Sequence, residues 1–164
     1  MYGQSSFGLS QTLHINRNDA KEYITAYFQK FCRVKAYLDE LKELASERMY
    51  TETMFGRKRY LPEIRSSDKR VRAMAERMAI NTPIQGTAAD MIKLAMIRIQ
   101  EQISRRSLYS RLILQVHDEL ILEVLPSEFE ELKLIVLQQM EQVVSLKIPL
   151  KVDWCHGLNW LEMN

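Results

Sequence analysis

The stretch LILQVHDELILEVL, residues 112–125, decides the fold of this 164-residue chain. Two apolar runs, Leu112–Val116 and Leu120–Leu125, flank the polar residues His117-Asp118-Glu119. In the first run, apolar residues alternate with others at a period of two, which is typical of a strand with one buried face. The pattern predicts a β-hairpin over residues 110–125 with its polar residues at the tip.

Two adjacent carboxylates, those of Asp118 and Glu119, stand at this predicted tip. Adjacent acids in a turn are most often solvated, because Asp suits turns for its own backbone reasons. Here both flanking strands are apolar enough to be core strands, so the tip rests on a rigid platform that suits a functional site. Carboxylate oxygens are ligands that Mg²⁺ prefers, and two Mg²⁺ ions can promote an in-line phosphoryl displacement. Such a site needs carboxylates from more than one segment.

Upstream of the hairpin, the sequence predicts a long helical stretch that contains a proline. Ser66, Ser67 and Asp68 are candidate N-caps for a helix that begins near Lys69. Pro83 should bend or restart that helix, because proline has no N–H to donate. Beyond Pro83, apolar residues recur at helical spacing: Ala88, Met91, Ile92, Ala95, Met96, Ile99 and Ile103.

The remaining segments complete an α+β fold. A helical pattern begins near Asn18 and continues to Leu44, as one helix or a bent pair, and 51–62 reads as a short hairpin that turns at Gly56. Ser127 and Glu130 have the spacing of a capping box that opens a further helix. A final strand is predicted over 150–154. We therefore expect a small antiparallel sheet, made of hairpin 110–125 and strand 150–154, packed against several long helices.

Composition and charge narrow the class of protein. Hydrophobic residues make up 46% of the chain, enough for a real core. Cys32 and Cys155 lack metal-ligand spacing, which favours reduced cysteines in a cytoplasmic protein. No apolar run is long enough to cross a bilayer, so no membrane partner is expected.

Positive charge is concentrated in one part of the chain. Residues 57–77 include eight basic and three acidic residues, a net charge of +5, so the rest of the chain carries −3 of the overall +2. Such a block is either a solvated face or a surface for a polyanion, with nucleic acid the first candidate.

Four segments resemble family A DNA polymerases, the group that contains bacterial DNA polymerase I. The segment QVHDE, residues 115–119, between its apolar strands resembles the palm motif of that family. AERMAINTPIQGTAAD, residues 75–90, is similar to the long palm helix, and TMFGRKRYLP, residues 53–62, to the segment ahead of it. Tyr2-Gly3 with Ser6-Phe7-Gly8 is similar to the end of the fingers motif. These matches run in order and cover essentially the whole chain.

The resemblance implies an organisation and an activity. Residues 1–50 would be fingers-derived helices and residues 51–164 the palm subdomain, together an incomplete palm with a remnant of the fingers in a single structural unit. The parent protein would be a template-directed DNA polymerase of replication and repair, which transfers a nucleotide from dNTP to a primer 3′-hydroxyl by a two-metal mechanism. Its cofactor would be Mg²⁺, and its partners primer-template DNA and dNTP.

The resemblance also implies a role for individual residues. Asp118 would be a metal ligand and Glu119 its neighbour in the same catalytic site, with His117 beside the primer terminus. The minor groove presents similar acceptors for every base pair, so donors there serve a sequence-blind enzyme. The expected DNA contacts are Arg77, Asn81 and Gln85 in the minor groove, Arg57, Lys58 and Arg59 at phosphates, and Tyr2 near the templating position.

The family's other catalytic aspartate and its dNTP-binding fingers helix precede the matched part. The resemblance therefore predicts that this chain alone does not extend primers and binds Mg²⁺ weakly or not at all. An unpaired edge of the palm sheet would also favour self-association.

Two other functions stay open. One is a DNA-binding module without catalysis. The other is a Mg²⁺-dependent phosphodiesterase built on Asp118 and Glu119, which would need a third carboxylate at the tip, with Asp153 the obvious candidate.

Overall fold

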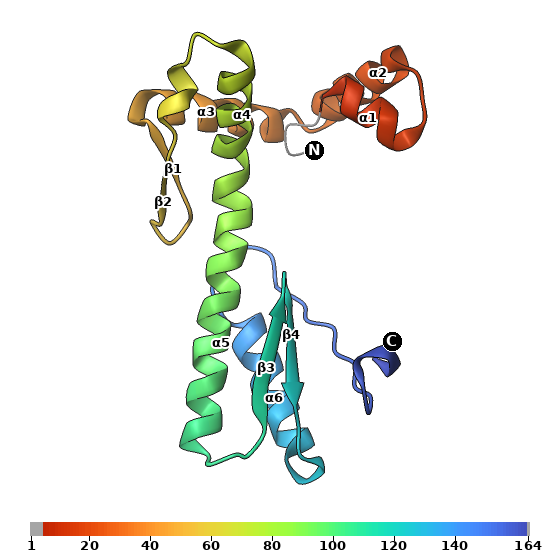
Figure 1. Ribbon diagram of the computed structural model, residues 1–164, viewed down its shortest axis with the longest axis vertical. Helices are drawn as coiled ribbons and strands as arrows, with labels where there is room; N and C mark the ends of the chain where they lie inside the picture. The colour runs from red at the N-terminus through yellow and green to blue at the C-terminus, as the bar shows by residue number, and fades with distance from the viewer. Residues whose placement is uncertain (1–4, 164) are drawn as a thin grey trace. The chain divides into compact units, whose positions relative to one another are not determined.

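The computed structural model describes residues 5–163 as helices and two short antiparallel hairpins (Figure 1). Contacts between Cα atoms divide the chain into two compact units, one ending at Thr87 and the other beginning at Ala88. The predicted fold class, helices with small antiparallel sheets, is confirmed. The assignment of 1–50 to fingers and 51–164 to palm stays a prediction.

The first unit is mostly helical. Its elements are α1 (Ser6–Leu13), α2 (Arg17–Lys30), α3 (Cys32–Arg48), β1 (Tyr50–Glu52), β2 (Lys58–Tyr60), the 3-10 turn η1 (Pro62–Arg65), α4 (Lys69–Asn81) and the π-helical turn η2 (Thr82–Gly86). The apolar pattern does not indicate α1, which Ser5 caps by accepting the Gly8 N–H at 3.1 Å. The stretch from Asn18 to Leu44 is two helices, because the backbone of Phe31 leaves the helical region between them.

The core of the first unit joins α3, η1 and α4. Its buried side chains are Ala45, Leu61, Ile64, Ala75 and Ala79, with Met49 and Met78 packed at its margin. Alanines on both α3 and α4 let the two helices approach closely, since interaxial distance depends on the side chains at the contact. Next to this core, Arg65 donates from Nε and Nη2 to the carbonyls of Ser46 and Glu47, at 2.7 and 3.1 Å. These bonds satisfy acceptors that the end of α3 leaves open.

The hairpin of β1 and β2 forms as the sequence predicts. Tyr50 pairs with Tyr60 and Glu52 with Lys58 in antiparallel register, and Gly56 takes a φ of +79° in the turn between the strands. Glycine adopts this left-handed conformation without the steric cost of a Cβ. The buried Thr51 hydroxyl reaches outside the hairpin and donates to the carbonyl oxygen of Ala79 on α4 at 3.2 Å.

The helical stretch around Pro83 combines a predicted cap with an altered helix. The carboxylate of Asp68 caps α4 by accepting the N–H of Arg70 at 2.8 Å, which confirms Asp68 among the three cap candidates. At Pro83 the chain passes into η2, whose hydrogen bonds span five residues, and α5 (Thr87–Arg105) follows directly. The sequence predicts that Pro83 bends or restarts the helix; in the structure the irregularity is a π-helical turn. Such turns are frequent at functional sites.

The second unit packs a hairpin against helices. After α5 come β3 (Arg111–Val116), β4 (Glu119–Glu123), the 3-10 turn η3 (Pro126–Glu128), α6 (Phe129–Glu141) and η4 (Trp160–Glu162). Figure 1 shows β3 and β4 beside α5 and α6. Ile99 and Ile103 of α5 and Leu132 of α6 form the buried centre of this core. The hairpin contributes Leu120 and Leu122 to it.

Two sequence predictions in the second unit are wrong. Residues 150–154 form no strand, and the sheet containing β3 has only β4 as its partner in the described part of the chain. The Val152 N–H donates to the Glu141 carboxylate at 3.1 Å, and the Trp154 ring lies under the Lys133 ammonium at 3.4 Å. Side chains of α6 therefore hold this segment in place of a neighbouring strand.

The capping box at Ser127 and Glu130 also does not form. Ser127 lies inside η3, which Pro126 opens, and α6 begins at Phe129 without a side-chain cap. The preceding 3-10 turn moves the start of α6 two residues beyond Ser127. Among residues 5–163, no helix is both long and apolar enough to span a membrane.

Replacing Thr51 with valine should destabilise the chain by about 1–3 kcal/mol, because it removes a hydroxyl donor from a buried backbone carbonyl while keeping the shape of the side chain. Urea unfolding measures this change in the free energy of unfolding. Thr25→Val is the matched control, since the exposed Thr25 hydroxyl donates only to Lys21 of its own helix. The control should stay within about 0.5 kcal/mol of the parent chain. Equal losses in both variants would contradict a specific role for the bond to Ala79.

Candidate active site

The tip of the β3–β4 hairpin is a two-residue turn. Val116 pairs with Glu119, which leaves His117 and Asp118 to connect the strands. His117 takes a φ of +54°, in the left-handed region where few residues other than glycine are comfortable. The side-chain amide of Gln115 donates to the His117 carbonyl oxygen and supports this conformation. The predicted hairpin and its polar tip are thus both present.

Both carboxylates at the tip face solvent. Asp118 and Glu119 are exposed, and neither side chain has a hydrogen-bond or ion-pair partner within residues 5–163. They are hard oxygen donors that need not break another bond to meet a cation, which fits the donor set of Mg²⁺. The described residues bring no third His, Cys, Asp or Glu to this pair, Asp153 included. The pair therefore fits part of a metal site.

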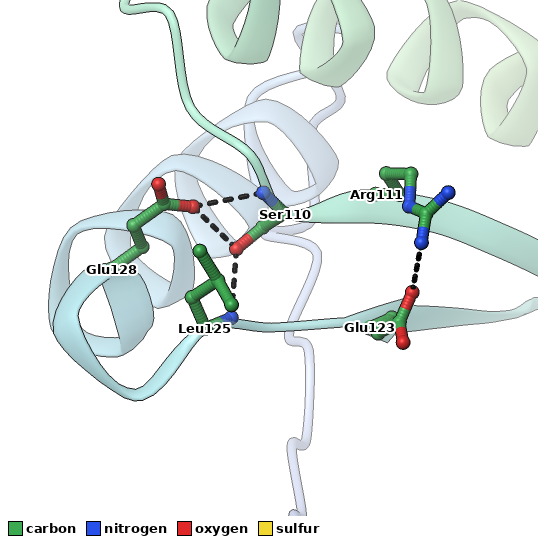
Figure 2. A network of polar contacts seen from close by, with 5 residues as sticks. All are labelled: Ser110, Arg111, Glu123, Leu125 and Glu128. Atoms are coloured by element: carbon green, nitrogen blue, oxygen red, sulfur yellow. Dashed lines mark hydrogen bonds and ion pairs between the residues drawn. The ribbon is translucent and has the colours of Figure 1, made fainter.

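A polar network holds the other end of the hairpin (Figure 2). The carboxylate of Glu128 accepts the Ser110 N–H at 2.9 Å and the Ser110 hydroxyl at 2.5 Å. It also accepts the N–H of Tyr109 at 2.9 Å. The Ser110 oxygen in turn accepts the Leu125 N–H at 3.0 Å. Ser110 is buried, so one carboxylate fixes the start of β3 and, through Ser110, the end of β4. These bonds position the strands that carry the tip.

The network also changes the acidity of Glu128. The Ser110 hydroxyl, followed by the backbone N–H groups of Tyr109 and Ser110, holds the pKa of Glu128 below its ordinary value. The Arg111–Glu123 ion pair beside it, 2.8 Å long, is exposed on both sides and contributes little. Sequence reasoning missed Glu128, because nothing local indicates partners eighteen and nineteen residues earlier in the chain.

A β-bulge interrupts β3 between its base and its tip. The register shifts between Leu112 and Leu114, so Ile113 has no partner on β4, and its side chain is 58% exposed. The side-chain alternation that the sequence predicts is thus broken at Ile113. Bulges re-aim the residues that follow them and are over-represented next to active sites.

The predicted minor-groove residues lie on α4 and η2 of the first unit. Arg77 and Gln85 are exposed, whereas Asn81 is half-buried. The Oδ1 atom of Asn81 is fully buried and accepts no hydrogen bond from the described residues. The interval from Asn81 to Gln85 passes through π-helical bonding, so the regular four-residue spacing assumed from the sequence does not extend to Gln85.

The predicted phosphate contacts Arg57, Lys58 and Arg59 are exposed, yet each also touches its own unit. Arg57 Nη2 donates to the carbonyl oxygen of Gly86 at 3.0 Å. The Lys58 ammonium lies 4.6 Å from the centroid of the Tyr50 ring, and Arg59 Nη2 lies 3.3 Å from the sulfur of Met78. Tyr2 lies outside the described residues.

Comparison with known proteins identifies the family. The profile of DNA polymerase family A matches residues 1–162. The chain belongs to DNA polymerase family A. It is 48% identical over 162 residues to DNA polymerase I of Bacillus caldotenax and, equally, to that of Geobacillus stearothermophilus. Each alignment covers 99% of this family A chain and 18% of the relative, so the chain spans less than a fifth of their length.

A solved structure agrees with this assignment. The family A chain is similar to the POL domain of Pol1 from M. smegmatis, solved in complex with a DNA primer-template and dNTP. The TM-score is 0.87 and the sequence identity 46%, over 92% of this chain and 26% of that one. Agreement at this level supports the fold of both units.

Glu128 should make the stability of this family A chain depend on pH in the acid range. Its folded pKa is lowered, so its contribution is fully present above the ordinary glutamate pKa of about 4.3 and is lost as pH falls through the folded value. The stability difference between the parent and Glu128→Gln should therefore be larger at pH 7 than at pH 3, as measured by urea unfolding.

The matched control for this experiment is Glu130→Gln. Glu130 is exposed in the first turn of α6, two residues after Glu128, and has no side-chain partner in the part of the chain that the structure describes. This variant should show no such change with pH. A constant difference between the parent and Glu128→Gln from pH 3 to pH 7 would contradict the role of the charged carboxylate.

Proposed function

We propose that this family A chain forms part of the active site of a DNA-directed DNA polymerase that adds a dNTP to a primer 3′-hydroxyl on a template strand. The observation that carries the proposal is the tip of the β3–β4 hairpin. There, two exposed carboxylates without partners among residues 5–163 stand on strands anchored in an apolar core, in a chain of DNA polymerase family A. The primer-template and dNTP bound by the M. smegmatis POL domain support the same partners for the parent of this chain.

Asp118 and Glu119 are the residues that would hold Mg²⁺. Mg²⁺ bound in a complete two-metal site supplies activation of the attacking hydroxyl and stabilisation of the leaving oxygen. Because the described residues add no third ligand to the pair, further ligands have to come from the rest of the polymerase. The hairpin would hold the two carboxylates at a fixed place. The Glu128 network supports the hairpin at its base, and the Gln115 amide supports it at its tip.

The remaining residues would bind DNA. His117, in the same turn as Asp118, would lie beside the primer terminus. Arg77, Asn81 and Gln85 carry N–H donors suited to the minor-groove acceptors that all base pairs share. Lys58 and Arg59 are exposed cations suited to phosphate, which would make the affinity depend on salt.

A segment exchange tests the catalytic proposal. This chain replaces the matching 162-residue segment of Bacillus caldotenax DNA polymerase I, and primer extension is measured with Mg²⁺. We expect synthesis by the chimaera and a loss of more than about 100-fold in the Asp118→Asn variant, beyond the effect of residues that only support a metal ligand. The control Asp153→Asn removes an exposed carboxylate that does not join the pair, and should leave synthesis unchanged.

Each failure of this experiment has a distinct meaning. Equal losses in Asp118→Asn and Asp153→Asn would favour the phosphodiesterase alternative. Duplex binding that survives Asp118→Asn, with no synthesis by any chimaera, would favour the non-catalytic DNA-binding module. The purified 164-residue chain is the third arm, and we expect no primer extension from it; metal-dependent synthesis by this chain alone would contradict that expectation.

The hairpin sheet also supports the expected self-association. Within the described residues β3 and β4 pair only with each other, and Ile113 and Leu114 on β3 are 58% and 43% exposed. An unpaired edge with exposed apolar side chains is a template for another chain. Light scattering of the purified chain should show a mass that rises with concentration, and Ile113→Lys should suppress the rise. A monomer mass at every concentration would contradict the proposal.

A further inference from the structure

Side chains from the β1–β2 hairpin and from Thr87 hydrogen-bond backbone groups around Pro83. Because Pro83 has no N–H, it cannot make the usual helical bond to the Ala79 carbonyl, and the Thr51 hydroxyl donates to that oxygen at 3.2 Å. Arg57 Nη2 donates to the Gly86 carbonyl at 3.0 Å. The Thr87 hydroxyl donates to the Pro83 carbonyl and accepts the Met54 N–H at 2.9 Å. These bonds link the hairpin to both ends of η2.

The hairpin also fits closely against η2 at Gly86. A Cβ added to Gly86 would lie 2.7 Å from the Thr53 methyl carbon and 3.3 Å from Arg57 Nη2. The first distance is too short for any real contact, and Thr53 is buried with 4% exposure, so its methyl has little room to move. A glycine is therefore required here by the approach of the hairpin.

We propose that Thr51, Arg57 and Thr87, here called the hairpin clamp, hold η2 in its π-helical form, and that Arg57 is a positioning residue for Gln85 and Asn81 rather than a phosphate contact. The first part stands on the contacts alone. The second part rests on the proposed function, in which those two side chains meet DNA.

The clamp matters because the form of η2 determines in which direction around the helix axis its side chains point. A π-helical turn contains one more residue than the α-helical turn it replaces, and such turns occur mostly as single turns inside α-helices. If η2 relaxed to α-helix, the helical register would shift by one residue, a rotation of about 100°. Gln85 lies next to the clamped Gly86 carbonyl, so it would be re-aimed relative to Asn81.

Arg57→Met tests the clamp by removing the guanidinium while keeping a long side chain. Hydrogen exchange followed by NMR on the 164-residue chain should show protection of the Met54 amide, which Thr87 Oγ1 accepts, falling by about tenfold or more. The control Arg70→Met removes the same charge from α4, where Arg70 has no side-chain partner in the described chain, and should leave that protection unchanged. Unchanged protection in Arg57→Met, or an equal fall in both variants, would overturn the clamp.

A second pair of variants keeps the proposal testable if Arg57→Met does not fold. Gly86→Ala should lower the protection of the Met54 amide, because the new Cβ strikes the Thr53 methyl. Adding Thr53→Ser removes that methyl but keeps the hydroxyl that accepts the Arg57 N–H, and should restore protection. Failure of this rescue would overturn the close fit on which the clamp depends.

DNA binding distinguishes positioning from phosphate contact. With duplex DNA and fluorescence anisotropy, Arg57→Met should weaken binding without changing the slope of log K against log salt, and should cause no further loss in a Gln85→Ala background. A phosphate contact would instead lower the slope by about 0.9 and add to the loss caused by Gln85→Ala, and either result would overturn the positioning role. If the parent chain binds no duplex, the proposed function fails, whereas the hydrogen-exchange result still decides the clamp.

Discussion

The missing N–H of Pro83, in the middle of an unbroken helical run, is the constraint around which the first unit is organised. Proline inside a helix removes a hydrogen bond and places its ring against the carbonyl four residues earlier. Here α4 continues through η2 into α5 without an intervening loop, and hydroxyl and guanidinium donors reach the neighbouring carbonyls. The threonine side chains are short, so their hydroxyls reach these backbone groups only if the hairpin lies close to η2. Gly86 permits that close approach because it has no Cβ. The hairpin is thus structurally coupled to the helix beside it.

In the second unit, the carboxylate of Glu128 holds the β3–β4 hairpin in position. A two-stranded hairpin is marginal by itself, so its strands need support from elsewhere. Apolar contacts with α5 and α6 stabilise the hairpin, but they do not fix its position along the strand axis, because hydrophobic attraction is not directional. Hydrogen bonds are directional, and those from Tyr109 and Ser110 to Glu128 fix the base of the hairpin. The bulge at Ile113 lies between this anchor and the tip, where it re-aims the residues that follow.

The features that sequence could predict depend on residues close in the chain. Gly56 in its turn, Asp68 as a cap and the hairpin around His117 and Asp118 are each determined within a few residues, and the structure contains all three. The capping box at Ser127 was equally local, but the 3-10 turn opened by Pro126 takes its place. The strand predicted over 150–154 needed a neighbouring strand, which no local pattern guarantees.

The residues of the candidate site likewise fall into those that the local sequence indicates and those whose contacts depend on the fold. The chemical type of Asp118 and Glu119 suggests a metal role from sequence, whereas the partners of Glu128 and Arg57 lie eighteen to twenty-nine residues away and follow only from the fold. Similarity to relatives identifies the family without supplying these contacts. That is why the hydrogen bonds of Glu128 and Arg57 were not predicted, whereas the hairpin turn that carries Asp118 was.

The basic block shows how structure changes the meaning of a charge count. Of its eight cations, Arg57 and Arg65 donate to backbone carbonyls, Arg59 contacts Met78 and Arg72 lies 3.7 Å from Glu76. Lys58 sits over an aromatic ring, which leaves its ammonium partly engaged. Three cations have no hydrogen-bond, ion-pair or ring partner in the described chain, and all three lie on α4: Lys69, Arg70 and Arg77.

Under the proposed function, this distribution adds α4 to Lys58 and Arg59 as a candidate surface for the DNA phosphates. Arg70 and Arg77 are seven residues apart, two turns of α4, so they share one face about 10 Å apart. Cations in the first turn of a helix, such as Arg70, are disfavoured by the helix dipole, so intramolecular electrostatics do not explain their position. A phosphate backbone along that face would offset the cost. Salt-dependent affinity would then arise from α4 as well as from Lys58 and Arg59, whereas Arg57 would act through the geometry of η2.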